Sequence, residues 1–318
     1  MNRQVRVALY GNNGHQLRSA LINHPHAELV AVGAIPRDWL PAELAGVTQY
    51  RSLDELLADS SVELIIFCSP RRADQAGEAV KALRAGKHVY AEKPAAITER
   101  DLDAIMAAAR ESGRQFHEMA GTVLQQPYRE MRRQIQAGAV GTVVQVLAQK
   151  CYPWGDWRPK DEALDGGLAL QVGIYPMRYC EHIAGVRIAE VLEFETRLGD
   201  ERADSACRMA VLMMMRLENG GIASAVCNYL NPMKDRCWGY EILRIFGTKG
   251  IIESSMETNE LRLIEPGQPP VVLQQEPPTE DYFDAYARHL TTGTPMPLTM
   301  EEELSATRWA IRGRSKTL

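Results

Sequence analysis

The sequence lacks an excess of positive charge and lacks long apolar runs, and each absence excludes a class of protein. Its 36 Lys and Arg residues against 41 Asp and Glu give a formal net charge of −5. Nucleic-acid-binding proteins usually present a basic face, so no nucleic-acid partner is expected. The basic clusters at residues 71–75 and 129–133 are interpreted as solvated helix surface. No apolar stretch approaches the roughly 18 residues of a membrane span, and the N-terminus leads directly into an expected strand, so neither a membrane partner nor a signal peptide is expected.

Cysteine is also scarce, and none of the six cysteines forms a C-x-x-C pair. Most of them lie within apolar runs, which favours buried free thiols in a reducing cytosol over a zinc site. The sequence therefore predicts a cytoplasmic protein without a metal. The apolar share of 45% and the charged share of 24% are ordinary for a globular chain.

Short apolar runs alternate with helical segments over the first 120 residues. Expected strands cover residues 5–11, 27–35, 62–69, 88–94 and 115–121. Expected helices cover residues 16–24, 52–59, 74–86 and 98–113. Strands that alternate with helices of this length indicate a doubly wound parallel sheet in an α/β domain.

The regular alternation of expected strands and helices ends after residue 121. A helix at 127–138 and a strand at 143–150 precede a glycine-rich helical segment at 165–185. Strands separated by turn signals then follow, and a last helix is expected at 299–316. This pattern predicts an α+β domain over residues 122–318 with a large, mostly antiparallel open sheet. The last helix could return to the first domain.

The expected strand at 206–217 is apolar on both faces. Both alternate sets of side chains in "CRMAVLMMMRL" contain apolar residues, and such a strand needs cover on both faces. Helices can cover one face. We expect a sister subunit to cover the other, which predicts a homodimer or homotetramer formed through this sheet. A fully intramolecular core is the alternative.

Four segments resemble the glucose–fructose oxidoreductase / inositol dehydrogenase / MocA family. They are "VALYGNNGHQL" at 7–17, "YAEKPAAIT" at 90–98, "DGGLALQVGIYP" at 165–176 and "YEILRIFGTKGIIES" at 240–254. The resemblance implies an N-terminal Rossmann domain over residues 1–121 and a C-terminal domain over 122–318 that binds substrate and forms the oligomer. It also implies NAD or NADP bound between the domains, and hydride transfer to or from a sugar, polyol or related small molecule.

The resemblance assigns the cofactor diphosphate to the loop after the first strand. Gly11 matches the first glycine of the family's loop, which permits a tight strand-to-helix turn. Asn13 and Gln16 stand where the second and third glycines usually are. The N-terminus of the following helix and the side chain of Asn13 are expected to face the diphosphate. The full set in the loop is Gly11, Asn12, Asn13, Gly14, His15 and Gln16, and a glycine turn without a ligand is the alternative.

Other cofactor contacts follow the next strands. NAD-preferring members carry an acidic residue where this chain has Ala34, and Arg37 could pair with a 2′-phosphate, which favours NADP slightly. The alternative for Arg37 is surface solvation. Residues expected beside the nicotinamide half are Ser69, Pro70, Glu92, Lys93 and Pro94.

The family's catalytic groups map onto Lys93 and Tyr175. The lysine cation would stabilise charge on the reacting oxygen, and the phenol would give or take its proton. Gln171 stands where the family has an aspartate, so it could orient substrate without carrying charge. Gln171 and Tyr175 are four residues apart, which would place them on one helix face.

Trp154, Trp157 and Arg158 precede the catalytic segment. In the family this stretch contacts substrate, so these side chains could stack on a sugar ring or bind an anion. A loop anchored by its own aromatic residues is the alternative.

Three functions are compatible with this pattern. The leading hypothesis is an NAD(P)-dependent oxidoreductase for a sugar, polyol or related hydroxy or carbonyl compound. The second hypothesis is a catalytically silent protein that binds cofactor or ligand and acts as a regulator. It is motivated by the altered positions Asn13, Gln16 and Gln171. A lyase or hydrolase that recycles tightly held NAD is the third.

Overall fold

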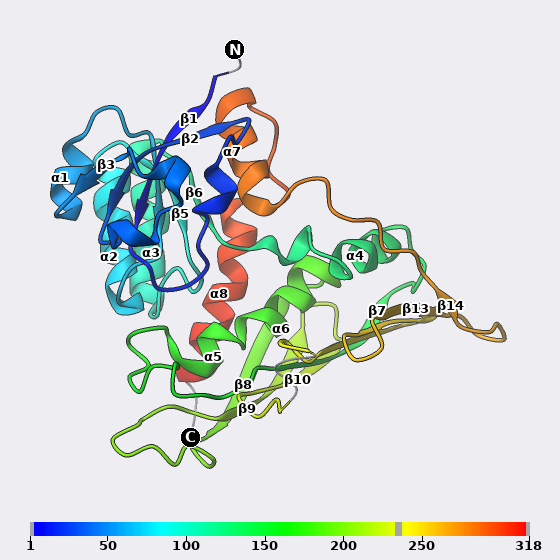
Figure 1. Cartoon of the computed structure of the whole chain (residues 1–318). Helices are drawn as coiled ribbons and strands as arrows, with labels where there is room; N and C mark the ends of the chain where they lie inside the picture. The colour runs from blue at the N-terminus through cyan, green and yellow to red at the C-terminus, as the bar shows by residue number, and fades with distance from the viewer. Residues whose placement is uncertain (1–2, 233–236, 316–318) are drawn as a thin grey trace. The chain divides into compact units, whose positions relative to one another are not determined.

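The structure is a computed structural model that describes residues 3–232 and 237–315 (Figure 1). The chain divides into two compact units. The first unit comprises residues 1–120, 163–165 and 280–304, and the second comprises residues 121–162, 166–279 and 305–318.

A six-stranded parallel sheet forms the centre of the first unit, with strand order β3-β2-β1-β4-β5-β6. This confirms the doubly wound fold. All four residues of β4 are buried, as expected for a strand covered on both faces. The strands are β1 Val5–Tyr10, β2 Ala27–Gly33, β3 Thr48–Tyr50, β4 Leu64–Phe67, β5 His88–Ala91 and β6 Phe116–Glu118.

Helix ends in the first unit follow their capping residues. The Ser52 hydroxyl accepts a hydrogen bond from the Glu55 N–H at 3.2 Å, and Gly113 closes α3 in the left-handed region at φ +66°. Helices α2 and α3 pack against each other beside the sheet (Figure 1). The α-helices that lie wholly within this unit are α1 Leu53–Ala58, α2 Arg72–Arg84, α3 Glu99–Ser112 and α7 Tyr282–Thr292.

The helix expected at residues 16–24 is wrong. Only a single 3₁₀ turn, Ser19–Leu21, forms there. Hydrogen bonds from Cys68 Sγ to the His15 carbonyl and from the His15 N–H to the Glu92 carboxylate fix the start of this segment. Asn23 then adopts φ +54°. Too few residues remain between these points for a stable helix.

The second unit contains an eight-stranded sheet with the order β14-β13-β12-β11-β7-β10-β9-β8. Among the described strand pairs of this sheet, β7–β10 is parallel and the others are antiparallel, so the expected mostly antiparallel sheet is confirmed. The strands are β7 Val143–Cys151, β8 Ile188–Thr196, β9 Ala210–Leu217, β10 Ile222–Asn228, β11 Glu241–Gly247, β12 Ile251–Ser255, β13 Glu260–Ile264 and β14 Val271–Val272.

Short helices lie against one face of this sheet, where α5 contacts β9 and β10, and α6 contacts β7. The expected helix at 165–185 is interrupted: it forms α5, then α6, then a π-helical turn at Tyr179–Ile183. None of the helices in the described part of the chain is long and apolar enough to cross a membrane. The α-helices are α4 Tyr128–Gln136, α5 Gly167–Gln171, α6 Ile174–Arg178 and α8 Met300–Ser315, which begins in the first unit.

Strand β9 buries one face and exposes the other. Met213 is 0% exposed, whereas Leu212 and Met214 are 43% and 45% exposed. Leu212 pairs directly with Phe194 on β8 and with Val226 on β10. Those two side chains are also exposed, at 43% and 40%. The chain therefore leaves a row of apolar side chains uncovered on the outer face of its own sheet.

Candidate functional site

The loop after β1 requires glycine at its first position. Gly11 has φ +82°, and a Cβ added there would lie 2.2 Å from the Cys68 carbonyl oxygen. β1 lies between β2 and β4 in the sheet, at the point where the strand order reverses. Open α/β sheets bind their ligands at this point, so the loop opens where a nucleotide would be held.

Two amides of the loop are available to a ligand. The N–H groups of Asn12 and Gly14 have no acceptor among the described residues, whereas the Asn13 N–H donates to the Cys68 carbonyl at 3.0 Å. Free loop amides of this kind bind phosphate oxygens. The expected helix N-terminus behind them is missing, so a diphosphate would depend on the loop alone.

The two polar replacements in the loop bond to the protein itself. The Asn13 amide donates to the carbonyl of Leu164 and, at 3.3 Å, to that of Pro70. The Gln16 amide donates to the Gly14 carbonyl at 3.1 Å. In this conformation Asn13 therefore anchors the loop, in place of the phosphate contact expected for its side chain.

The Glu92 carboxylate lies against the same loop. It accepts hydrogen bonds from the His15 N–H at 2.5 Å and the Lys93 N–H at 3.0 Å, and it lies 2.8 Å from His15 Nδ1. Burial alone would raise the pKa of this carboxyl, but the bonds and charge of His15 lower the pKa to about 2. A Cβ at Gly14 would meet this carboxylate, so glycine is required there.

A buried pair on α2 supports the loop and the segment after β5. Arg72 is 0% exposed and donates to the Asn13 carbonyl at 2.8 Å. Gln75, also 0% exposed, donates to the Glu92 carbonyl at 2.6 Å and to that of Pro94 at 3.2 Å. The interpretation of residues 71–75 as solvated surface is therefore wrong for Arg72 and Gln75, which hold the loop after β1 and the segment after β5 in place.

Lys93 lies at the end of β5 and is only 4% exposed. Its backbone is fixed on both sides, by the Gln75 contacts and by a bond from the Ala95 N–H to the Glu118 carboxylate at 2.7 Å. Ser69 is also buried, and its hydroxyl donates to Glu78 at 2.5 Å. Lys93 therefore lies buried on a fixed segment of the first unit. Glu92 connects this segment to the loop after β1, residues 11–16, which is called the nucleotide loop below.

The end of β2 carries no acidic side chain. Ala34 follows the strand at φ +53°. Arg37 begins the next 3₁₀ turn as an exposed side chain, and it has no ion-pair partner among the residues whose placement is described. Both features are compatible with a 2′-phosphate at this edge. Overall, the loop fits a dinucleotide: Gly11 gives the turn, and Asn12 and Gly14 offer amides.

The second unit contains a cavity of about 540 Å³ above its sheet. Amide and hydroxyl side chains line one part of it, among them Gln125, Gln126, Ser254, Ser255 and Asn259. Aromatic and charged groups line another part, among them Tyr128, Lys150, Tyr152, Tyr175 and Glu241. Polar groups that converge on a cavity of this size are typical of a small-molecule site.

A cross-strand ion pair forms the floor of this cavity. Lys150 on β7 lies directly opposite Glu241 on β11, and their side chains form a salt bridge. The Lys150 ammonium also lies 3.8 Å from the centre of the Tyr175 ring. Lys150 is 3% exposed, so its charge acts at short range within a poorly hydrated site.

Two phenols bond to the carboxylate of Glu241. The Tyr128 and Tyr179 hydroxyls lie 2.8 Å apart, and both donate to Glu241. Burial, followed by the charge of Glu241, raises the pKa of both phenols well above the usual value. Burial likewise raises the pKa of Tyr152, with Tyr175 as the next contributor. These phenols therefore act as neutral hydrogen-bonding groups.

Tyr175 lines this cavity, and Gln171 is not among the lining residues. The two residues do not share an uninterrupted helix, because α5 ends at Gln171 and α6 begins at Ile174. At Gly173 a Cβ would lie 2.2 Å from the Ala169 carbonyl oxygen and 2.1 Å from Met213 Cε. A glycine is thus needed where the two helices meet, and a joint role for Gln171 and Tyr175 stays a prediction.

The aromatic loop at 154–158 packs against itself and against Tyr229, the residue after β10. Trp154 stacks on Tyr229 at 5.4 Å, and the Arg158 guanidinium lies 3.8 Å from the same ring. Arg158 also donates to the Pro153 carbonyl at 3.0 Å. This packing favours the anchored-loop alternative for Trp154 and Arg158, whereas Trp157 is 57% exposed.

Sequence reasoning singled out Tyr175 but missed the other groups that line this cavity beside it, namely Tyr128, Lys150, Tyr152 and Glu241, and the neighbouring Tyr179. Lys150 is the one charged residue of β7, and a lone charge in a strand is a signal that could have identified it. Glu241 is 91 residues away, and only the β7–β11 register brings the pair together.

Comparison with known proteins identifies both parts of the chain. Residues 5–119 match a family model described as an oxidoreductase family with an NAD-binding Rossmann fold, and residues 128–253 match the GFO/IDH/MocA C-terminal domain. A dTDP-3,4-didehydro-2,6-dideoxy-alpha-D-glucose 3-reductase of Streptomyces violaceoruber is 31% identical over 64% of this chain. That match spans 62% of the reductase, which is less than two thirds of its length.

Two further relatives extend the comparison. A myo-inositol 2-dehydrogenase of Thermotoga maritima is 22% identical over 71% of this chain and 67% of its own. The crystal structure of an aldose-aldose oxidoreductase from Caulobacter crescentus, complexed with glycerol, covers 98% of this chain and 97% of its own, with a TM-score of 0.79 and 21% identity. This structural likeness concerns the fold.

Proposed function

Because the chain belongs to the GFO/IDH/MocA family of oxidoreductases with an NAD-binding Rossmann fold, we propose that it transfers a hydride between NAD(P) and a sugar, polyol or related hydroxy or carbonyl compound. The observation that carries this proposal is the buried Lys93, which follows β5 on a segment bonded to the nucleotide loop through Glu92.

The cofactor would be held by the chain's first unit. The amides of Asn12 and Gly14 would receive the diphosphate, and Arg37 supports a slight preference for NADP through a 2′-phosphate. When bound, the nicotinamide supplies or accepts the hydride. Cytoplasmic location remains a prediction, which the six buried free cysteines support.

The substrate would be held by the cavity of the second unit. Its amide and hydroxyl lining supports a polyhydroxylated compound, because each substrate hydroxyl would find a donor or an acceptor. Tyr175 would give or take the proton of the reacting oxygen. Lys93 would stabilise negative charge on that oxygen, and Lys150 would hold the Tyr175 ring in place.

A panel assay tests this proposal. NADPH or NADH is mixed with sugar and polyol substrates, or with their keto forms, and absorbance is followed at 340 nm. We expect turnover with at least one substrate, and a loss of at least 100-fold in kcat for Tyr175→Phe and for Lys93→Met. Lys81→Met, the same type of change at an exposed position of α2, is the control and should retain most of the kcat.

Two other outcomes would favour the rival functions. Tight cofactor binding with no turnover on any substrate would favour the regulatory protein, for which Gln171 in place of aspartate is the motivating feature. Cofactor that copurifies, with substrate consumed and no net change at 340 nm, would indicate a lyase or hydrolase that recycles NAD.

A further inference from the structure

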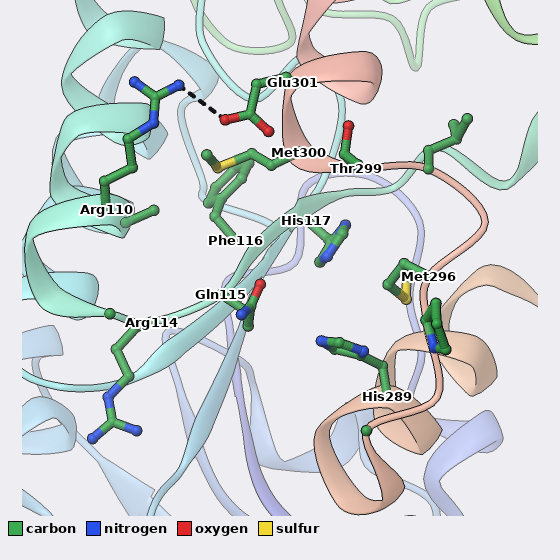
Figure 2. Close-up of a pocket in the computed structure, with 15 residues that line it drawn as sticks. Arg110, Arg114, Gln115, Phe116, His117, His289, Met296, Thr299, Met300 and Glu301 are labelled. Carbon is green, nitrogen blue, oxygen red and sulfur yellow. Dashed lines mark hydrogen bonds and ion pairs between the residues drawn. The ribbon is translucent and has the colours of Figure 1, made fainter.

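Besides the cavity of the second unit, the first unit contains a cavity of its own, which the proposed function does not use. It measures about 560 Å³ and is lined by the end of α3, by β6, and by the chain between α7 and α8 (Figure 2). All of these residues belong to the first unit. Phe116, Met296 and Met300 give it apolar walls.

Two histidines present unpaired ring nitrogens to this cavity. His117 is 3% exposed, and its Nδ1 lies 2.6 Å from the Glu303 carboxylate. His289 Nδ1 lies 2.8 Å from the Thr294 carbonyl, which can only accept, so this nitrogen carries the proton. Neither Nε2 atom has a hydrogen-bond partner among the described residues, and both histidines line the cavity. A ligand can supply that partner.

The geometry argues against a metal ion here. The two imidazole centres lie 6.5 Å apart. A tetrahedral metal at about 2 Å from both nitrogens would bring the ring centres to about 5 Å. In addition, no cluster of three His, Cys, Asp or Glu residues suited to a metal occurs in the part of the chain described. The nitrogens are therefore suited to a hydrogen-bond donor.

The mouth of the cavity carries an excess positive charge. Arg110 pairs with Glu301 at 2.9 Å, so those charges cancel. Arg114 is exposed and has no ion-pair partner among the described residues. Figure 2 shows its guanidinium turned away from the two imidazoles, with the Gln115 side chain across the cavity from them. An anion at the mouth would attract the flexible arginine back over the opening.

We propose that this cavity is a binding site for a small organic carboxylate with a hydroxyl or amino group on the adjacent carbon. The carboxylate pairs with Arg114, the hydroxyl or amino group donates to the Nε2 of His289 or His117, and an apolar body contacts Met296 and Met300. Hydroxy acids and amino acids share this chemistry. The site is independent of the proposed hydride transfer.

A set of probes with one carbon skeleton tests the site by calorimetry. The probes are leucine, 2-hydroxy-4-methylpentanoate, 4-methylpentanoate and leucinamide. We expect saturable binding of leucine, of the hydroxy acid, or of both, and whichever binds identifies the donor. The probe without a donor and the probe without a carboxylate should bind at least tenfold more weakly.

Two variants localise the binding. Arg114→Gln should weaken binding of the probe by about tenfold, and Arg100→Gln, at the start of α3 and 89% exposed, should not. His289→Phe removes the Nε2 acceptor and should also weaken binding, with thermal unfolding as the check that the variant is folded. Both variants should bind NADPH as the wild type does, so failure here is distinguishable from failure of the proposed function.

Three results would overturn the proposal. They are no saturable binding of leucine or of the hydroxy acid, binding that is equal for all four probes, and binding that is unchanged in Arg114→Gln.

Discussion

At the residue scale, the most informative side chain is Glu92. It is 1% exposed, its carboxylate bonds to the nucleotide loop, and its pKa lies at about 2. The sequence identified the residue through its motif but not its partner His15, 77 positions away. The turn at Gly11 was predicted correctly, because a glycine at the end of a strand is a local turn signal. Lys93 was assigned by the family resemblance, and its role stays a prediction.

The Glu92 carboxyl predicts a pH-dependent stability. Its folded-state pKa lies below the ordinary 4.5, so the stabilisation is present above pH 5 and is lost as pH falls towards 2. The contribution amounts to about 3 kcal/mol at neutral pH and declines by about 2 kcal/mol by pH 3. Urea unfolding at several pH values should therefore show the gap between wild type and Glu92→Gln narrowing on acidification.

Glu111→Gln, a change at an exposed position of α3, is the matched control. Its stability should follow that of the wild type at every pH. A gap between wild type and Glu92→Gln that stays constant from pH 6 to pH 3 would contradict the ionised, His15-bound carboxylate.

At the scale of elements, strands were predicted better than helix continuity. Buried strands such as Leu64–Phe67 are continuous apolar runs in the sequence. Helices such as Glu99–Ser112 have recognisable capping residues at both ends. The missing helix after the nucleotide loop could not be predicted, because contacts of His15 with the distant Cys68 and Glu92 fix that segment. The break between α5 and α6 contains Gly173, and glycine inside a helical segment is a local signal for such a break.

The junction of α5 and α6 provides a prediction. Gly173→Ala places a methyl group against the Ala169 carbonyl and Met213 Cε, so it should destabilise the fold by about 1–3 kcal/mol and displace Tyr175. Under the proposed function, kcat should fall while the affinity for NADPH is retained. Gly77→Ala, in the exposed part of α2 with nothing within 4 Å, should instead stabilise by about 0.5–1 kcal/mol.

Chemical denaturation and steady-state kinetics measure the two effects. An unchanged stability in Gly173→Ala would mean that the kink does not depend on glycine.

At the scale of the whole molecule, the exposed apolar row on β8, β9 and β10 is the principal unexplained surface. The sequence predicted a strand apolar on both faces, and the structure covers one of them. Contiguous exposed apolar side chains usually mark an interface. We propose that this face pairs with a second copy of the chain, in a homodimer or a homotetramer.

Charge on that face should separate the copies. The double variant Leu212→Lys with Met214→Lys should sediment as a monomer under conditions in which the wild type is an oligomer. Leu198→Asp, which alters an 84% exposed leucine beyond β8, is the control and should not change the mass. A wild type that is monomeric at all concentrations, or a double variant with unchanged mass, would contradict this interface.

The central claim is that the loop opening at Gly11 binds a nicotinamide dinucleotide although it has no helix behind it. Calorimetric titration of the purified protein with NADPH and with NADH tests this most directly. The account predicts saturable binding of at least one of them and its loss in Gly11→Ala. No heat and no change in NAD(P)H fluorescence with either cofactor would contradict it.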